Sequence, residues 1–219
     1  MSLGPGQQLL EVVAALVLLT AWISLVHRRL DALVSLYALQ SASMAGVAVL
    51  VAYLYDAPLL YLTAATIAGL NAVIVPQVLL RIRRDLQIPG EVNMFVSVRT
   101  SALAGLGCLL LAELVVGPLT PLAQIPAAGL LPISVTVVLI GLFLAATRRK
   151  AFTQVLGMLE MANGVFLAGL ALTFGLGLLL ELGVAANLLI LAIVGRLFLY
   201  RMKDSFDTVD ADTLRALEG

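Results

Sequence analysis

The sequence has few of the residues that catalytic and metal-binding proteins ordinarily use. It holds one cysteine, Cys108, and one histidine, His27, in 219 residues. A lone cysteine excludes an internal disulfide, and without a Cys/His cluster the usual zinc and iron–sulfur sites are excluded as well. We also find no nucleophile paired with a base and no glycine-rich phosphate loop. The sequence therefore predicts no cofactor and no metal, and it argues against a stand-alone enzyme.

Charged residues are scarce too. They make up 12% of the chain, against 62% hydrophobic residues, and the mean hydropathy is +1.09. Thirteen basic and thirteen acidic side chains cannot cover the apolar surface that a water-soluble fold of this composition would expose. The formal net charge of zero gives no general attraction to nucleic acid. We expect an all-α integral membrane protein surrounded by the lipid bilayer.

Seven apolar runs are long enough to cross that bilayer. A spanning helix needs about 20 apolar residues to cover roughly 30 Å of hydrocarbon. Charged or Gly/Pro-rich breaks delimit the predicted spans at 7–26, 31–55, 58–80, 94–116, 130–147, 152–176 and 181–200. The longest connection, 116–132, contains four prolines and no charge, which predicts an ordered surface loop or a short re-entrant segment. The whole chain is thus expected to form a single membrane domain.

The basic residues predict the orientation of these spans. Seven spans place four basic runs on one side, at 27–31, 81–85, 148–150 and 201–203. The opposite loops, around Asp56, in 117–130 and around Glu181, contain no lysine or arginine. Because Lys and Arg accumulate in cytoplasmic loops, the N-terminus is predicted to face the periplasm or exterior and the C-terminus the cytoplasm.

Two segments of the chain resemble each other. "RRLDALVSLYALQSASMAGVAVL" (28–50) aligns without a gap on "RRKAFTQVLGMLEMANGVFLAGL" (148–170), an offset of 120 residues that places Gln40 on Glu160. The alignment predicts two parallel three-helix repeats joined by a linking helix, which returns the chain to its starting side. The alternative is that leucine- and alanine-rich helices with arginines at their cytoplasmic ends align by composition alone.

The repeat hypothesis divides the membrane domain into four parts. These are a first three-helix repeat (1–84), a linking helix and loop (85–129), a second three-helix repeat (130–204) and a cytoplasmic tail (205–219). One repeat would then carry an ionisable group where the other has a neutral amide.

Glu160 is the most informative single residue. It lies ten residues after Lys150, about 15 Å along a helix and so half-way through a hydrocarbon core of roughly 30 Å. A charge at that depth costs about 2.5–3.5 kcal/mol or more, and intramembrane carboxylates usually face the bundle interior and mark proton or ion paths. A buried carboxyl group can take up and release a proton near neutral pH. A proton relay is one interpretation, and a protonated glutamate in a helix–helix hydrogen bond is the other.

Four amides and one arginine at intermediate depth could extend a path from Glu160: Asn163, Gln40, Asn71, Asn187 and Arg196. Asn163 follows Glu160 by one helical turn on the same face. Each amide could instead be a hydrogen-bonding contact between packed helices. Arg196 could either extend to the interface or approach Glu160 and favour its charged form.

The basic turn followed by a helix with a central glutamate and then an asparagine, in "RRKAFTQVLGMLEMANGVFLAGL", resembles the K subunit of bacterial respiratory complex I. It also resembles the C subunit of Mrp-type multisubunit sodium/proton antiporters. With its length, its four preceding spans and its tail "FDTVDADTLRALEG", the chain is most similar to component E of hydrogenase-4-type membrane-bound hydrogenases. The close resemblance covers about residues 130–210.

The resemblance implies a cofactor-free subunit that helps couple electron transfer to proton or sodium translocation, with Glu160 at the position of the family's central glutamate. Its implied partners are antiporter-like membrane subunits and a peripheral nickel–iron hydrogenase-like arm, in a bacterial or archaeal cell membrane. One departure is that the complex I subunit has a second carboxylate in its last helix, where "GVAANLLILAIVG" offers only Asn187. The alternative functions are a subunit of a cation/proton antiporter and a structural scaffold without a relay role.

Overall fold

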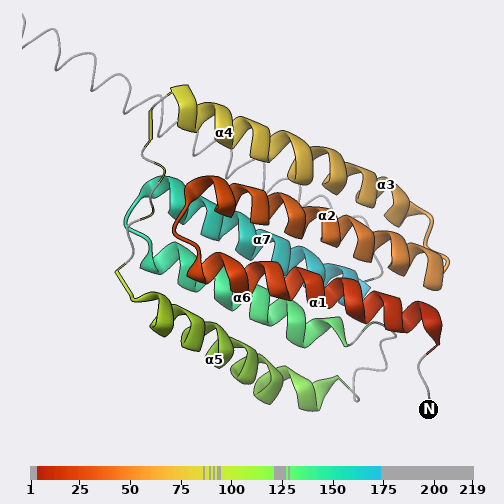
Figure 1. Ribbon diagram of the computed structural model, residues 1–219. Coiled ribbons are helices and arrows are strands. Elements are labelled where there is room, and N and C mark those ends of the chain that lie inside the picture. The colour runs from red at the N-terminus through yellow and green to blue at the C-terminus, as the bar shows by residue number, and fades with distance from the viewer. Residues whose placement is uncertain are drawn as a thin grey trace, which may run out of the picture.

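The structure is a computed structural model that describes residues 4–85, 87, 88, 90, 92, 95–120, 127 and 129–173. Every regular element in these residues is a helix (Figure 1). The elements are α1 (Pro5–Val26), α2 (Leu30–Leu54), α3 (Leu59–Thr66), the π-helix η1 (Ile67–Ile74), α4 (Val75–Asp85), α5 (Val98–Val116), the short 3₁₀ turn η2 (Gly117–Leu119), α6 (Leu130–Thr147) and α7 (Ala151–Thr173). Because α3, η1 and α4 run on without a break, the described residues contain six helices long and apolar enough to cross a membrane.

These six helices confirm the first six predicted spans to within a few residues, with two corrections. The third extends to Asp85, five residues beyond the predicted end at 80, because arginines at a helix end can lie along it and reach the interface. The fourth begins at Val98 instead of 94, since Ser97 caps α5 by accepting the Thr100 N–H at 3.2 Å. The seventh predicted span (181–200), with Asn187 and Arg196, lies outside the described residues, as do the tail and residues 121–126 and 128 of the loop 116–132.

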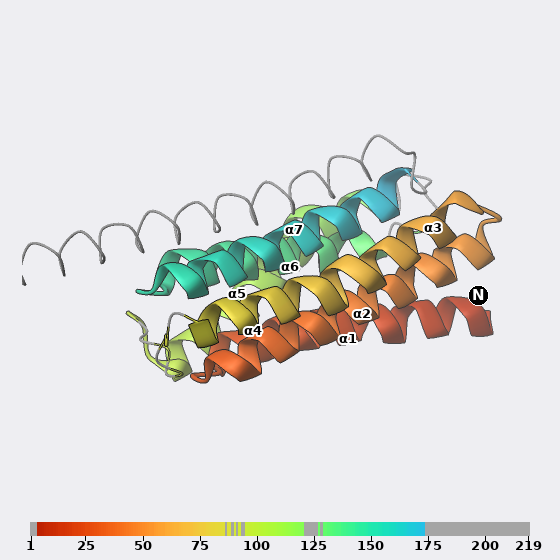
Figure 2. The same ribbon diagram turned by 90° about the horizontal axis from the view of Figure 1, so that it is seen from above.

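Two antiparallel helix pairs, α1–α2 and α6–α7, form the centre of the bundle (Figure 1). The pairs pack together through contacts of α1 with α6 and of α2 with α7. On one flank α5 covers α1 and α6, and on the other the continuous helix of α3, η1 and α4 covers α2, so that these helices lie at opposite edges of Figure 1. Seen from above, the helix of α3 and α4 runs alongside α2 (Figure 2). Helices α1, α2, α6 and α7 are therefore the ones that can enclose a site.

Three of the predicted basic runs, 27–31, 81–85 and 148–150, share one end of the bundle. The chain between α4 and α5 crosses this end and joins both neighbouring turns through backbone hydrogen bonds: Leu30 N–H to Gly90 O (2.8 Å), Val92 N–H to Arg28 O (2.8 Å) and Phe95 N–H to Thr147 O (3.1 Å). The Arg83 side chain forms an ion pair with Asp31. The fourth run, 201–203, lies outside the described residues.

The same contacts show that α1 and α6 both end at the basic end, so the two central pairs run in the same sense. This is the sense that the repeat hypothesis requires for the first two helices of each repeat. The third helix of the second repeat falls in the undescribed part of the chain, so the repeat and its domain boundaries stay predictions.

Glycines bring the backbones of α6 and α7 into direct contact. A Cβ atom added to Gly157 would lie 2.5 Å from the Ala145 backbone nitrogen and 2.8 Å from the Gly141 carbonyl oxygen. One added to Gly164 would lie 2.7 Å from the Val138 nitrogen. Such distances are far inside van der Waals contact, so only glycine fits here, as is common where membrane helices approach closely. This packing sets the position of α7 and of the polar side chains that it carries.

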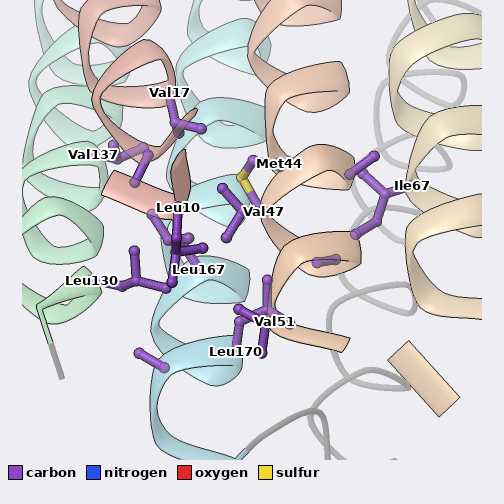
Figure 3. Packing of buried hydrophobic residues seen from close by; sticks show 14 of the residues in the cluster. Leu10, Val17, Met44, Val47, Val51, Ile67, Leu130, Val137, Leu167 and Leu170 are labelled. Atoms are coloured by element: carbon purple, nitrogen blue, oxygen red, sulfur yellow. The ribbon is translucent and has the colours of Figure 1, made fainter. Parts of the chain in front are cut away.

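The buried apolar side chains form two clusters. The larger cluster includes Leu10, Val17, Met44, Val47, Val51, Leu130, Val137, Leu167 and Leu170 (Figure 3). The smaller cluster includes Leu30, Leu33, Val34, Leu79, Phe152, Val155, Leu156 and Leu159. Along α2 the smaller cluster ends at Tyr37 and the larger begins at Met44, and along α7 the change falls between Leu159 and Leu167. Buried polar residues occupy the interval between the two clusters.

Candidate functional site

Glu160 is buried in the centre of the bundle, as the hypothesis from the sequence required. Its side chain is 4% exposed, and each carboxyl oxygen lies 3.0 Å from the Ser24 hydroxyl of α1. The Gln40 side chain of α2 lies beside the carboxyl group, and its amide nitrogen donates to the Val17 carbonyl oxygen of α1 at 3.5 Å. Glu160 therefore joins α7 to both helices of the first pair.

One turn along α7, Asn163 extends these polar contacts. Its amide nitrogen donates to Gln40 Oε1 at 2.9 Å and to Ser41 Oγ at 3.2 Å. All three side chains are almost completely buried, with Asn163 and Gln40 each 1% exposed. We call the five residues Ser24, Gln40, Ser41, Glu160 and Asn163 the polar layer. The structure thus brings together three of the residues that the sequence singled out, Glu160, Asn163 and Gln40.

The polar layer is enclosed by apolar packing on both sides. On α7 it lies between Leu159 of the smaller cluster and Leu167 of the larger one. Hydrogen bonds and charge effects are stronger in such a low-dielectric surrounding than in water, and a buried polar group without a partner costs correspondingly more. The protonation state of Glu160 therefore affects the hydrogen bonding of the whole layer.

Arg148 is a functional candidate that the sequence did not reveal. It is 1% exposed, and its Nη2 donates to the backbone oxygens of Ser24 (3.1 Å) and Leu25 (3.0 Å). The sequence predicted 148–150 as one basic run and did not distinguish its members. In the structure the turn between α6 and α7 directs the Arg148 side chain into the bundle, while Arg149 is exposed and stacks 4.3 Å from the Phe95 ring centroid.

Arg148 keeps its charge in this setting. Burial lowers the pKa of the Arg148 guanidinium to about 10, and the nearby Glu160 carboxyl opposes this shift by raising it. The group is therefore protonated at neutral pH. Arg196, which the sequence suggested as a cation near Glu160, lies outside the described residues; within them, Arg148 has that position.

Asn71 does not join the polar layer. It lies half-buried in η1, and in the described part of the chain no hydrogen bond connects it to Glu160 or Gln40. The wide π turn immediately precedes Pro76 in α4, where the missing N–H interrupts the regular α-helical hydrogen bonding. The hypothesis that Asn71 extends a path from Glu160 has no support from these contacts.

Ser24 and Ser41 were missed because single hydroxyls in apolar helices are ordinary and usually bond their own backbone. Only the packing of α1 and α2 against α7 brings them to Glu160 and Asn163. No group of three His, Cys, Asp or Glu side chains that could hold a metal occurs within the described ranges.

The comparisons with known proteins identify a bacterial relative of the whole chain. The chain is 30% identical over 202 residues to "Uncharacterized protein Rv0085" of Mycobacterium tuberculosis, a match that covers 91% of this chain and 92% of the mycobacterial protein. The chain belongs to the Rv0085 family. No protein-family model matches the sequence, and no solved structure matches it. The similarity therefore extends over nearly the full length of both chains.

Proposed function

We propose that this protein is a membrane subunit of a complex I-related, hydrogenase-type energy-converting complex, in which Glu160 relays protons while electrons pass through another subunit. The observation that carries the proposal is the polar layer: a carboxyl group at mid-bundle, 4% exposed, contacts polar groups from two other helices. Intramembrane carboxylates in such surroundings mark ion and proton paths.

The Ser24 hydroxyl supports a relay because it can serve both protonation states of Glu160. It lies 2.6 Å from the Ala21 carbonyl oxygen and 3.0 Å from each Glu160 oxygen, and a hydroxyl has one proton to donate but can also accept. It donates to an ionised Glu160. When Glu160 is protonated, the Ser24 hydroxyl donates to the Ala21 carbonyl oxygen and accepts a hydrogen bond from the carboxyl O–H. A proton can thus arrive or leave without leaving Ser24 unpaired.

The partners in this proposal follow from the resemblance of residues 148–170 to the complex I K subunit. They are antiporter-like membrane subunits and a nickel–iron hydrogenase-like arm, and this chain supplies no redox cofactor. The proposal includes a seventh span at 181–200 and a bacterial or archaeal cell membrane, with the N-terminus outside and the basic end of the bundle in the cytoplasm.

The orientation can be tested by cysteine labelling in a Cys108→Ser background. We expect Arg149→Cys, at the exposed basic end, to react with a membrane-impermeant maleimide only after the cytoplasmic side is opened. Asp56→Cys, in the exposed turn between α2 and α3, should react in intact cells. Arg149 is the suitable position because Arg148 is buried. The reverse labelling pattern would contradict the orientation.

The relay role is tested in the purified assembly reconstituted into vesicles. Glu160→Gln keeps the side-chain shape and a hydrogen-bonding amide but cannot titrate. It should still assemble, although with lower stability than the parent, and it should lower proton translocation per assembled complex about tenfold or more, with Glu160→Asp milder. The matched control is Glu113→Gln, the same change at an exposed position near the end of α5. If the Glu160→Gln assembly pumped at the parent rate, the relay role would be wrong.

Two alternatives give different results in the same preparation. A subunit of a cation/proton antiporter would purify with antiporter-like proteins and without a nickel–iron large subunit. A scaffold would keep full coupled activity in Glu160→Gln. The scaffold alternative is favoured by one observation, the amide network of Asn163 with Gln40 and Ser41, because such contacts between helices also stabilise membrane bundles without any transport role.

A further inference from the structure

The buried guanidinium of Arg148 takes no part in the proton path described above. Its Nη2 caps two carbonyls in the last turn of α1, Ser24 O and Leu25 O. Carbonyls at a helix C-terminus lack intrahelical partners and carry the negative end of the helix dipole. These two hydrogen bonds fix the position of the Arg148 side chain, but they use only one of the three guanidinium nitrogens.

The other two nitrogens, Nε and Nη1, are buried and have no hydrogen-bond partner within the described part of the chain. A cation with unused donors in an apolar bundle is costly unless an opposite charge compensates it. Glu160 is the acidic group whose charge acts on Arg148. Arg148 and Glu160 do not form a direct ion pair with a nitrogen–oxygen distance within 4.0 Å in the described part of the chain.

Ser24 connects the two charged groups. Its backbone oxygen accepts from Arg148 at 3.1 Å, and its hydroxyl contacts Glu160 at 3.0 Å. One residue of α1 is therefore bound from both sides, by the cation of the α6–α7 turn and by the carboxyl group of α7. A substitution of either charged side chain therefore affects the other in two ways, through the shared contact with Ser24 and through the electrostatic interaction between the two charges.

The repeated segment offers an internal comparison. At the offset of 120 residues, Arg28 corresponds to Arg148 and Gln40 to Glu160. Where the carboxyl group is replaced by the Gln40 amide, Arg28 is exposed; where Glu160 is present, Arg148 is 1% exposed. Of these two aligned segments, both described by the structure, only the one that contains the acid buries its arginine.

We infer that Arg148 is the internal counter-charge of Glu160, and that the two side chains and Ser24 form one coupled unit that stabilises the carboxylate form of Glu160 inside the bundle. Arg148 is a positioning residue in this unit, since it acts through Ser24 and through its charge. The inference concerns the electrostatics of the bundle and goes beyond the proposed relay, because it holds for a transporting and for a purely structural Glu160.

A double-mutant cycle on the full chain in mixed micelles tests the inference. The folded fraction is followed during titration with SDS for the parent, Arg148→Gln, Glu160→Gln and the double variant. We expect Glu160→Gln to destabilise the parent, because it leaves the buried cation uncompensated. In the Arg148→Gln background the same substitution should be neutral or stabilising. The coupling should change the folded-to-unfolded ratio about tenfold, as is found for groups in one network.

Two controls separate coupling from general damage. Arg149→Gln, the same change one residue along at an exposed position, should show no coupling to Glu160→Gln. Arg148→Lys keeps the charge and should restore part of the stability that Arg148→Gln loses. Additive effects of the two Gln substitutions would overturn the inference. So would a double variant that folds less well than Arg148→Gln alone, and so would the absence of folded protein in all three variants.

This cycle and the transport assay can fail independently. If the coupling is found but Glu160→Gln pumps at the parent rate, the charge pair stands and the relay is wrong. If pumping is lost while the Gln substitutions are additive, Glu160 relays protons without Arg148 as its counter-charge, and the inference is wrong.

Discussion

Replacing Gly157 with leucine should prevent the bundle from folding. The leucine Cβ alone would lie 2.5 Å from the Ala145 nitrogen and 2.8 Å from the Gly141 oxygen, and both of these are backbone atoms that cannot rotate away. Overpacking of a dense interior costs about 1–3 kcal/mol and occasionally more, and here two helices would have to separate. We expect a loss above about 3 kcal/mol, measured as disappearance of the monodisperse folded peak in fluorescence-detected size exclusion.

The stability change caused by the smaller substitution Gly157→Ala gives a stricter test of the same contact. Alanine is favoured over glycine by about 1 kcal/mol inside a helix, so Gly157→Ala should stabilise the protein if packing did not matter. We expect it to destabilise instead, by about 1–3 kcal/mol. The control is Gly107 on α5, where a Cβ would meet nothing within 4 Å; Gly107→Ala and Gly107→Leu should both leave the folded peak intact. Equal behaviour of the two glycines would contradict the backbone contact between α6 and α7.

The second large effect is expected at Asn163. Asn163→Leu keeps the branching of the side chain but removes the donor to Gln40 Oε1 and Ser41 Oγ. A buried group left without its partner costs about 1–3 kcal/mol, although hydrogen bonds between membrane helices are often weaker. We expect a loss of about 1–3 kcal/mol in the free energy of unfolding, measured by SDS titration.

Asn71→Leu is the matched control for this prediction. It makes the same chemical change at an asparagine that is half-buried in η1 and outside the polar layer. Its effect should stay within about 0.5 kcal/mol, as for substitutions away from a packed polar network. If Asn71→Leu were as damaging as Asn163→Leu, the two asparagines would have similar roles, and the restriction of the polar layer to α1, α2 and α7 would be wrong.

The substitutions at Gly157 and Asn163 should both affect the position of Glu160. Close contact at Gly157 and Gly164 holds α7 against α6, and Asn163 joins α7 to α2. Together they orient the face of α7 that presents Glu160 to Ser24. A variant that loosens either contact should therefore also disturb Glu160, and transport measurements on such variants need a matching measurement of folding.

Much of the fold follows from the sequence alone. The apolar runs predicted the first six helices to within a few residues, because each run is about as long as a helix that spans the hydrocarbon core and each break contains charge, glycine or proline. The shared end of the runs 27–31, 81–85 and 148–150 followed from an even number of crossings between them. The buried position of Glu160 could also be predicted, since a carboxylate at the centre of an apolar helix is too costly to leave in lipid.

Only the tertiary structure decided which side chains surround Glu160. The sequence could not distinguish the buried Arg148 from the exposed Arg149. Adjacent basic residues at a helix end give the same sequence pattern, and the direction of each side chain depends on the conformation of the turn between α6 and α7. It could not select Gln40 over Asn71, both amides at intermediate depth, since helix rotation and packing determine which faces the interior. It did not point to Ser24, an ordinary hydroxyl until α1 lies against α7. The depth of a residue in the membrane depends on its own helix and can be calculated from its distance along the sequence. Its neighbours on other helices depend on backbone contacts such as Gly157 with Ala145, which form only when the chain has packed.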